Sequence, residues 1–431
     1  MKKLIAISIV LVLLGPAVFA EVAVSAGVHG VFVPLEVENI KNQDDNVNAG
    51  SVIGWGGDRA RYAQITFAGE TEDGKAGFKT QLNVNENATV SLDDWAGAWV
   101  KPIDQIRLTV GRYQQDDIRG AIGANDGWAM AALAAKGEDN IFSRFTGDIG
   151  ALLDIYPVPG LGVHFNISNL AGTAYAGSAN VTPAFRVYER FQLAVSYELA
   201  GLGLIRAQYL NSDADGVNTR DANGRRIEAA FKFTAVEGLT LDVGVKVPFR
   251  YKLQDDFSVS MAPLNGMITI KDYRTAPWQA SVGASGTFGS FGIWGRIDTY
   301  FLGNERVNIE TPFGDYYWKE NEPFIVAFAL EPSYDLGFGT VGVYFAMEAA
   351  SDYKAKTDVP LLLLNQFGQT GDHTFGGGAQ AGFGAWFKIP VGSGAVKPGI
   401  AYRVRNNSDP WSFYGINNGY FSIPIEFDFS F

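Results

Sequence analysis

The feature that most restricts the fold of this chain is an alternation of apolar and polar residues that recurs along most of its length. In the last nine residues, Phe427, Phe429 and Phe431 share one phase, whereas Glu426 and Asp428 occupy the other. A period of two residues places successive side chains on opposite faces of a strand. Each such segment is therefore predicted to be a β-strand with one apolar and one polar face. A soluble β-sandwich has strands of the same period, so the lengths of the connections between strands are needed to distinguish it from a membrane barrel.

The connections between the alternating segments are short and long in turn. Short turns such as 72–74 and 289–290 alternate with long polar stretches. Short turns on one rim and long loops on the other are typical of a bacterial outer-membrane barrel. The sequence therefore predicts an all-β fold, an antiparallel up-and-down transmembrane β-barrel. The long stretches include 34–58, 114–140, 211–224, 250–276 and 351–372.

Counting the alternating segments gives about 18 strands, an even number as in single-chain bacterial barrels, with 16 as the alternative count. No shift in composition marks a second domain, so residues 21–431 are predicted to form one barrel domain. The predicted strands begin near residues 22, 61, 75, 93, 105, 141, 161, 184, 203, 225, 240, 277, 291, 323, 338, 374, 395 and 420.

Residues 1–20 have the form of a secretory signal peptide. Lys2 and Lys3 precede an apolar run from Leu4 to Leu14, and a cleavage site is predicted near Ala20. No later stretch has the ~18 apolar residues of a spanning helix, so a closed barrel is the membrane structure that remains. We therefore expect a protein of the outer membrane of a diderm bacterium, in contact with its lipid.

The charge and the cysteine content exclude other classes. Removing the signal peptide leaves 32 of the 34 basic residues against 46 acidic ones, a net charge of −14. That charge argues against nucleic acid as a partner. The chain has no cysteine, so hydrogen bonds and burial must hold the fold without disulfides.

The stretch from Asp94 to Tyr113, DWAGAWVKPIDQIRLTVGRY, resembles the fourth and fifth strands of the general porins of bacterial outer membranes. In that family an aromatic-Ala-Gly strand turns tightly into a strand ending in Gly-Arg. A long third loop follows, folds into the pore and sets its constriction. The resemblance implies that residues 114–140 fold into the pore, with acidic residues facing basic ones on the wall, and that the chain forms a homotrimer. The constriction residues expected on this basis are Lys75, Lys79, Arg107 and Arg112 on the wall and Asp116, Asp117, Asp126, Glu138 and Asp139 in the loop.

The position of Arg112 leaves alternatives open. By the resemblance it is the constriction arginine, yet in a straight strand it shares the phase of Leu108 and Val110, which face lipid. A bulge at Gly111 would turn Arg112 inward. Otherwise Arg107, which is in the pore phase, takes the role, or Arg112 reaches to the membrane rim.

The C-terminal strand carries a second element of the resemblance. A strand that ends on phenylalanine resembles the signal by which outer-membrane barrels are recognised for assembly. Phe427, Phe429 and Phe431 are therefore expected to be read by the barrel-assembly machinery, and this strand is expected to pair with the first strand and close the barrel.

Signals for catalysis, cofactors and metals are weak. His29, His164 and His373 have no metal-ligand spacing, and no Gly-x-Ser-x-Gly nucleophile elbow occurs. We predict no enzymatic activity and no cofactor. Asp213 and Asp215 begin a stretch like half a calcium loop, but its twelfth position is not the required Glu, so they are only a weak calcium candidate.

These observations predict a porin for passive diffusion of small hydrophilic solutes, which are filtered by size and charge. Basic and acidic residues are nearly balanced in the polar phase of the strands. On a lipid face each Arg or Lys would cost up to ~2–4 kcal/mol, so this phase is expected to line a wet lumen. The alternative is a surface-exposed adhesin or structural barrel whose long loops bind partners.

Overall fold

The computed structural model places most of the expected strands and leaves several connections and the N-terminal segment undescribed. No helix among the described residues is long and apolar enough to cross a membrane. The described residues are 21–40, 46–52, 63–84, 89–115, 145–167, 191–210, 226–249, 251–252, 257–259, 268–275, 278–301, 303–311, 314–321, 324–357, 373–375, 377–407 and 418–431.

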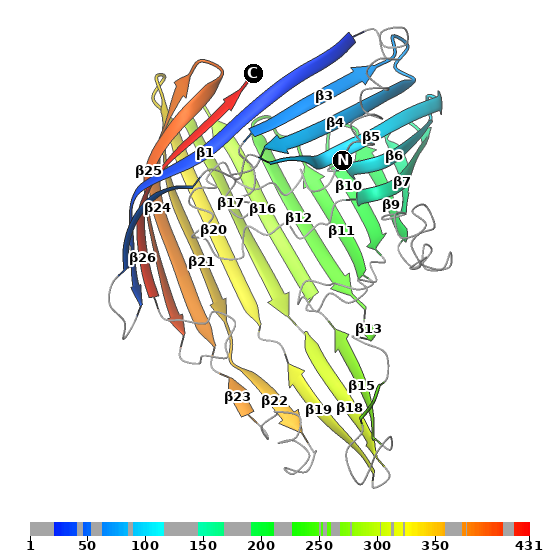
Figure 1. Cartoon of the computed structure of the whole chain (residues 1–431), viewed down its shortest axis with the longest axis vertical. Helices are drawn as coiled ribbons and strands as arrows, with labels where there is room; N and C mark the ends of the chain where they lie inside the picture. Colours follow the sequence, from blue (N-terminus) through cyan, green and yellow to red (C-terminus); the bar gives the residue numbers. More distant parts are fainter. Residues whose placement is uncertain are drawn as a thin grey trace.

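Antiparallel strands close into an 18-stranded barrel (Figure 1). Each barrel strand pairs with the next one along the chain, and β26 (Asn418–Ser430) pairs with β1 (Glu21–Ile40). Ala26 and Phe431 exchange two main-chain hydrogen bonds of 2.9 and 2.7 Å, so the closing pair extends to the last residue. The predicted fold, strand number and closure are confirmed. The other barrel strands are β3 (Ala63–Glu70), β4 (Ala76–Val84), β5 (Val90–Ile103), β6 (Ile106–Gln115), β7 (Phe145–Val158), β8 (Leu161–Ile167), β9 (Phe191–Leu199), β10 (Gly203–Leu210), β11 (Arg226–Phe233), β12 (Leu239–Pro248), β16 (Trp278–Phe288), β17 (Phe291–Phe301), β20 (Ile325–Asp335), β21 (Thr340–Ala350), β24 (Gly378–Val391) and β25 (Gly394–Asn407).

The two phases of each strand fall on opposite sides of the barrel wall. On β9, Gln192 and Ala194 are buried, whereas Leu193, Val195 and Tyr197 are each about two-fifths exposed. The buried phase faces the lumen and the exposed apolar phase faces outward, where a membrane would cover it. The alternation in the sequence therefore specifies which side of the wall each residue occupies.

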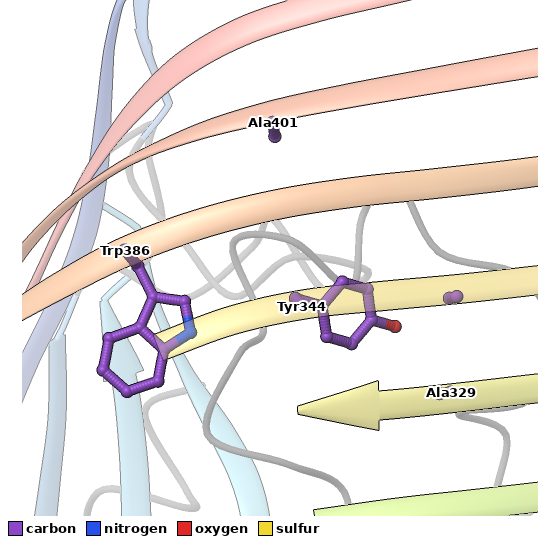
Figure 2. Close-up of a cluster of buried hydrophobic side chains, with 5 residues drawn as sticks. Ala329, Tyr344, Trp386 and Ala401 are labelled. Carbon is purple, nitrogen blue, oxygen red and sulfur yellow. The ribbon is translucent and has the colours of Figure 1, made fainter. Parts of the chain in front are cut away.

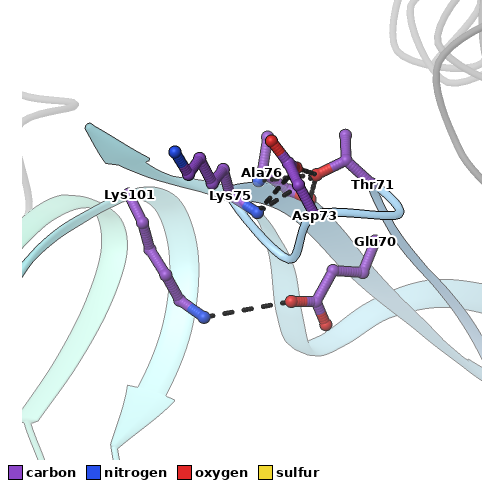
Figure 3. A network of polar contacts seen from close by, with 6 residues as sticks. All are labelled: Glu70, Thr71, Asp73, Lys75, Ala76 and Lys101. Atoms are coloured by element: carbon purple, nitrogen blue, oxygen red, sulfur yellow. Dashed lines mark hydrogen bonds and ion pairs between the residues drawn. The ribbon is translucent and has the colours of Figure 1, made fainter. Parts of the chain in front are cut away.

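Short turns join the strands at one rim, and the turn between β3 and β4 shows how they are held (Figure 3). The Thr71 hydroxyl donates to Asp73 Oδ1 over 2.7 Å, and the Lys75 main-chain N–H donates to the same carboxylate over 3.1 Å. The hydrogen bond from Thr71 has the largest effect, and both hydrogen bonds lower the pKa of the exposed Asp73 carboxyl. An ion pair of 3.9 Å between Lys101 Nζ and Glu70 Oε1 links this turn to β5.

A second antiparallel sheet continues part of the wall beyond the opposite rim (Figure 1). It corrects the prediction that 250–276 and 351–372 are loops throughout. Charged residues interrupt the apolar phase of these strands, as Asp272 does after Ile268 and Ile270, so the pattern that reveals a barrel strand is weaker there. Its strands are β13 (Tyr251–Lys252), β14 (Phe257–Val259), β15 (Ile268–Thr275), β18 (Asn304–Thr311), β19 (Gly314–Asn321), β22 (Tyr353–Thr357) and β23 (His373–Phe375).

The prediction of a loop at 34–58 is also corrected. β1 continues through Pro34 to Ile40 and pairs there with β2 (Asn46–Val52). The register shifts between Val33 and Glu36. Proline has no N–H for the ladder and is confined within sheets to edges and bulges. Pro34 therefore marks a bulge within a long strand rather than its end.

Candidate functional site

The inner face of the barrel is lined with ionisable and polar side chains. They come from the polar phase of almost every described barrel strand. Charges held away from bulk water need partners, and here they neighbour charges of opposite sign or amide and hydroxyl groups. The buried charged side chains are Asp154, Arg206, Arg226, Glu228, Asp242, Lys246, Arg296, Asp298, Glu331, Glu348, Lys397 and Glu426.

One ionic network spans β10 and β11. Arg226 Nε lies 2.7 Å from Glu228 Oε1, and the Gln208 amide donates to the other oxygen of Glu228. Lys246 stands directly opposite Glu228 on β12. Glu228 has no exposed surface, so these groups provide the compensation that its charge requires.

A second network lies on β16 and β17. Arg296 Nε donates to Asp298 Oδ1 over 2.9 Å and to Ser281 Oγ over 3.1 Å. Arg296 pairs with Gly283 on one side and Ala329 on the other, so small residues leave room for its guanidinium along the wall.

An aromatic cluster covers the inner wall on β20, β21, β24 and β25 (Figure 2). Tyr344 is 1% exposed and Trp386 is 6% exposed. The indole of Trp386 lies over Gly342, where an added Cβ would be 2.2 Å from the ring. Lys397 Nζ is 4.4 Å from the centre of the same ring. Lys397 and Trp386 thus form a cation–π pair on this part of the inner wall.

Two of the predicted wall cations lie on the lumen side. Lys79 Nζ is 5.0 Å from the ring centre of Trp95, and the Arg107 guanidinium carbon is 4.8 Å from that of Trp99. Arg107 also stands opposite Asp154 in the β6–β7 register. Both cations are partly exposed.

The side chain of Arg112 does not lie on the inner face of the wall, in agreement with the expectation for a strand without a bulge that turns it inward. Gly111 has a φ of 107°, and the β6–β7 register shifts next to it. Thr109 and Tyr113 are nonetheless both buried on the inner side, which places Arg112 between them on the outer side. Its Nη1 donates to the Leu92 carbonyl over 3.2 Å. Arg107, rather than Arg112, holds the inward position.

Lys75 does not lie on the wall near the rim from which segment 114–140 departs. It is exposed in the β3–β4 turn at the short-turn rim, whereas β6 ends at the opposite rim. Its expected role at the constriction stays a prediction.

The remaining predicted pore and metal residues lie outside the described residues, as do residues 1–20. Among the described residues, no group of three or more His, Cys, Asp or Glu side chains is arranged to hold a metal ion. The roles of the following residues stay predictions: Asp116, Asp117, Asp126, Glu138, Asp139, Asp213 and Asp215.

The terminal phenylalanines lie on the outer phase of β26. Phe427 and Phe429 are partly buried, and Phe431 is 74% exposed. The ring of Phe427 covers Gly30 on β1, where an added Cβ would be 2.4 Å from it. Their recognition during assembly stays a prediction.

The structure also joins polar residues that the sequence did not connect. The Tyr113 hydroxyl donates to Asn166 Oδ1, and Asn166 Nδ2 donates to Gln192 Oε1 over 2.7 Å. The first pair is separated by 53 residues and the second by 26. Only the register of β6 to β9 brings them together.

A closed antiparallel barrel with a charged inner face and an apolar outer face defines the class: this is an up-and-down β-barrel of the transmembrane type. No protein-family model and no curated protein matches the chain.

Similar solved structures include porins and an outer-membrane channel. An anion-selective porin from Comamonas acidovorans has a TM-score of 0.46 and 12% identity, over 95% of this chain and 100% of that one. OmpF of Salmonella typhi in complex with daunomycin has a TM-score of 0.43 and 15% identity, over 95% and 97%. OccK2 of Pseudomonas aeruginosa in complex with glucuronate has a TM-score of 0.43 and 10% identity, over 95% and 96%. The class rests on the strand pairing and not on these distant likenesses.

Proposed function

We propose that the protein is an outer-membrane porin for the passive diffusion of small hydrophilic solutes. The observation that carries the proposal is the segregation of charge: ionisable side chains line the inner face while apolar side chains cover the outer face. An 18-stranded barrel encloses more space than its own wall side chains fill, and a polar wall keeps that space wet. The lumen would select by size and by the field of its charges.

Conductance in a planar lipid bilayer tests the proposal. Folded protein purified in detergent should insert and give discrete, ohmic current steps in 1 M KCl. The same preparation unfolded by boiling is the control and should give none. Folded protein that inserts into the bilayer without opening channels would refute the porin function.

Several finer features belong to this proposal. Residues 114–140 would narrow the pore, residues 1–20 would be removed on export, and three copies would associate. Native mass spectrometry of the purified protein measures the number of associated copies, and a monomer under all detergent conditions would refute the trimer.

Joint replacement of Phe427, Phe429 and Phe431 by Ser should lower the amount of the protein in the outer membrane without blocking its export. Cell fractionation and immunoblotting measure both quantities.

A second candidate function is binding of an external partner, as in an adhesin. The sheet that extends beyond the long-loop rim favours it, because seven strands build a surface outside the membrane that diffusion alone does not require. Removal of residues 304–321, the β18–β19 hairpin, should then abolish attachment of cells to a matrix while leaving conductance unchanged. Unaltered attachment would refute this candidate.

A further inference from the structure

Three polar residues on adjacent strands of the inner wall form a hydrogen-bonded chain. His164 Nδ1 on β8 is 2.7 Å from Asp154 Oδ1 on β7. His164 Nε2 is 3.0 Å from Ser196 Oγ on β9. A serine, a histidine and a carboxylate joined in this order are the arrangement that activates a serine hydroxyl as a nucleophile.

For an ionised Asp154 and a neutral His164, the acceptor chemistry sets which atom of each pair donates. An ionised carboxylate only accepts, so Nδ1–H of His164 donates to Asp154. Nε2 of the neutral imidazole then accepts the hydrogen bond from the Ser196 hydroxyl. This is the tautomer in which histidine can take the proton of the serine.

The backbone is shaped to allow these contacts. Asp154 and His164 are paired directly across β7 and β8, whereas Ser196 is paired with Gly162, two residues before His164. A Cβ at Gly162 would lie 2.7 Å from both His164 Nε2 and Ser196 Oγ. The missing side chain therefore leaves the space in which the histidine and the serine meet. The ring of Tyr156 packs edge-on against His164, 6.0 Å between centres.

Exposure is graded along the chain of three residues. Asp154 is 3% exposed and His164 is 1% exposed, whereas Ser196 is only partly buried. A shielded carboxylate and base beside an accessible hydroxyl is what a nucleophile needs. Arg206 stands directly opposite Ser196 on β10, on its other side from His164. Arg206 is 2% exposed, so it places a shielded positive charge on the strand beside Ser196, and such a charge favours the negative charge that develops during acyl transfer.

We propose that Asp154, His164 and Ser196 form a hydrolytic centre for small carboxylic esters that enter the lumen. Ser196 Oγ bonds to the ester carbonyl carbon while its proton passes to His164 Nε2. The bond from that carbon to the alcohol oxygen then breaks, and His164 returns the proton to the departing alcohol. Water attacks the acyl-serine in the same way and releases the acid, so the net reaction is ester plus water to acid plus alcohol.

An active-site-directed fluorophosphonate tests the centre on the folded, detergent-purified full chain. Peptide mass spectrometry should locate one adduct, on Ser196. Ser196→Ala should abolish it, and His164→Gln should slow its formation by about 10²–10⁴-fold, the usual contribution of a general base. Hydrolysis of p-nitrophenyl acetate should fall in parallel.

Two further variants separate chemistry from structural damage. Ser285→Ala removes a partly exposed hydroxyl from the inner face of β16 and should leave labelling unchanged. Gly162→Ala should suppress labelling, because its methyl group separates the histidine from the serine. Heat-modifiable electrophoretic migration verifies that each variant is folded. No adduct on the folded wild-type chain, or equal labelling of Ser196 in His164→Gln, would overturn the proposal.

Discussion

Replacement of Asp298 by Asn is the sharpest test of how the inner wall is stabilised. The side chains of Arg296 and Asp298 are each 1% exposed, with Arg296 Nε 2.8 Å from Asp298 Oδ2. Asparagine keeps the size of the side chain but removes the charge. Leaving one member of a buried ion pair uncompensated costs roughly 3–5 kcal/mol. Asp242 also interacts electrostatically with Arg296, so we expect the lower end, about 3 kcal/mol.

The assay is reversible unfolding in guanidinium, followed by tryptophan fluorescence of the protein folded into lipid vesicles. A loss of about 3 kcal/mol corresponds to a change of roughly 150-fold in the unfolding equilibrium constant. Ser281→Ala is the milder comparison, because it removes one hydrogen bond to a charged group, worth about 1.5 kcal/mol. Replacing both charged partners with Arg296→Met and Asp298→Leu should restore much of the lost stability, since neither member of the pair is left alone and Asp242 keeps its interaction with Lys232.

Two results would refute this account of the wall. An Asp298→Asn protein within about 0.5 kcal/mol of wild type would mean that water screens the pair. A double variant as unstable as Asp298→Asn would mean that the loss comes from packing rather than from an uncompensated charge.

Three further predictions concern closure, the turns and the pore. Gly30→Ala should cost about 1–3 kcal/mol and lower the folded fraction on heat-modifiability gels, because its methyl group overlaps the Phe427 ring. Gly27→Ala is the control, since its Cβ would meet its nearest atom at 3.9 Å. Equal folding of the two variants would contradict the reasoning. Asp73→Asn should lower the unfolding free energy above about pH 4. The difference from wild type should vanish as pH falls through the lowered pKa of the folded state, because the hydrogen bonds that lower this pKa stabilise only the ionised carboxylate. A constant difference from pH 2 to pH 7 in denaturant titrations would contradict that sign. Deletion of 126–139 should raise single-channel conductance, and an unchanged conductance would place that segment outside the pore.

The sequence by itself determined the barrel strands, the sides of the wall and the class of fold. Side-chain direction in a strand depends only on position within that strand, so alternation such as that of Gln192 to Tyr197 identified the inner and outer residues. Turn chemistry is equally local, and most barrel strands begin within a few residues of the predicted positions. The closing pair of β1 and β26 also followed from the sequence, because a lipid-facing edge must be paired.

Only the tertiary structure decided which residues of different strands meet. The register across β7, β8 and β9 joins Asp154, His164 and Ser196, and nothing in their spacing of 10 and 32 residues indicates it. The structure also showed that Pro34 lies within a strand and that strands continue beyond the rim, where no lipid imposes an apolar face. Which residues pair across neighbouring strands is set when the whole sheet closes cooperatively. The alternation in the sequence records only that each strand has one face toward the lumen and one face toward the outside.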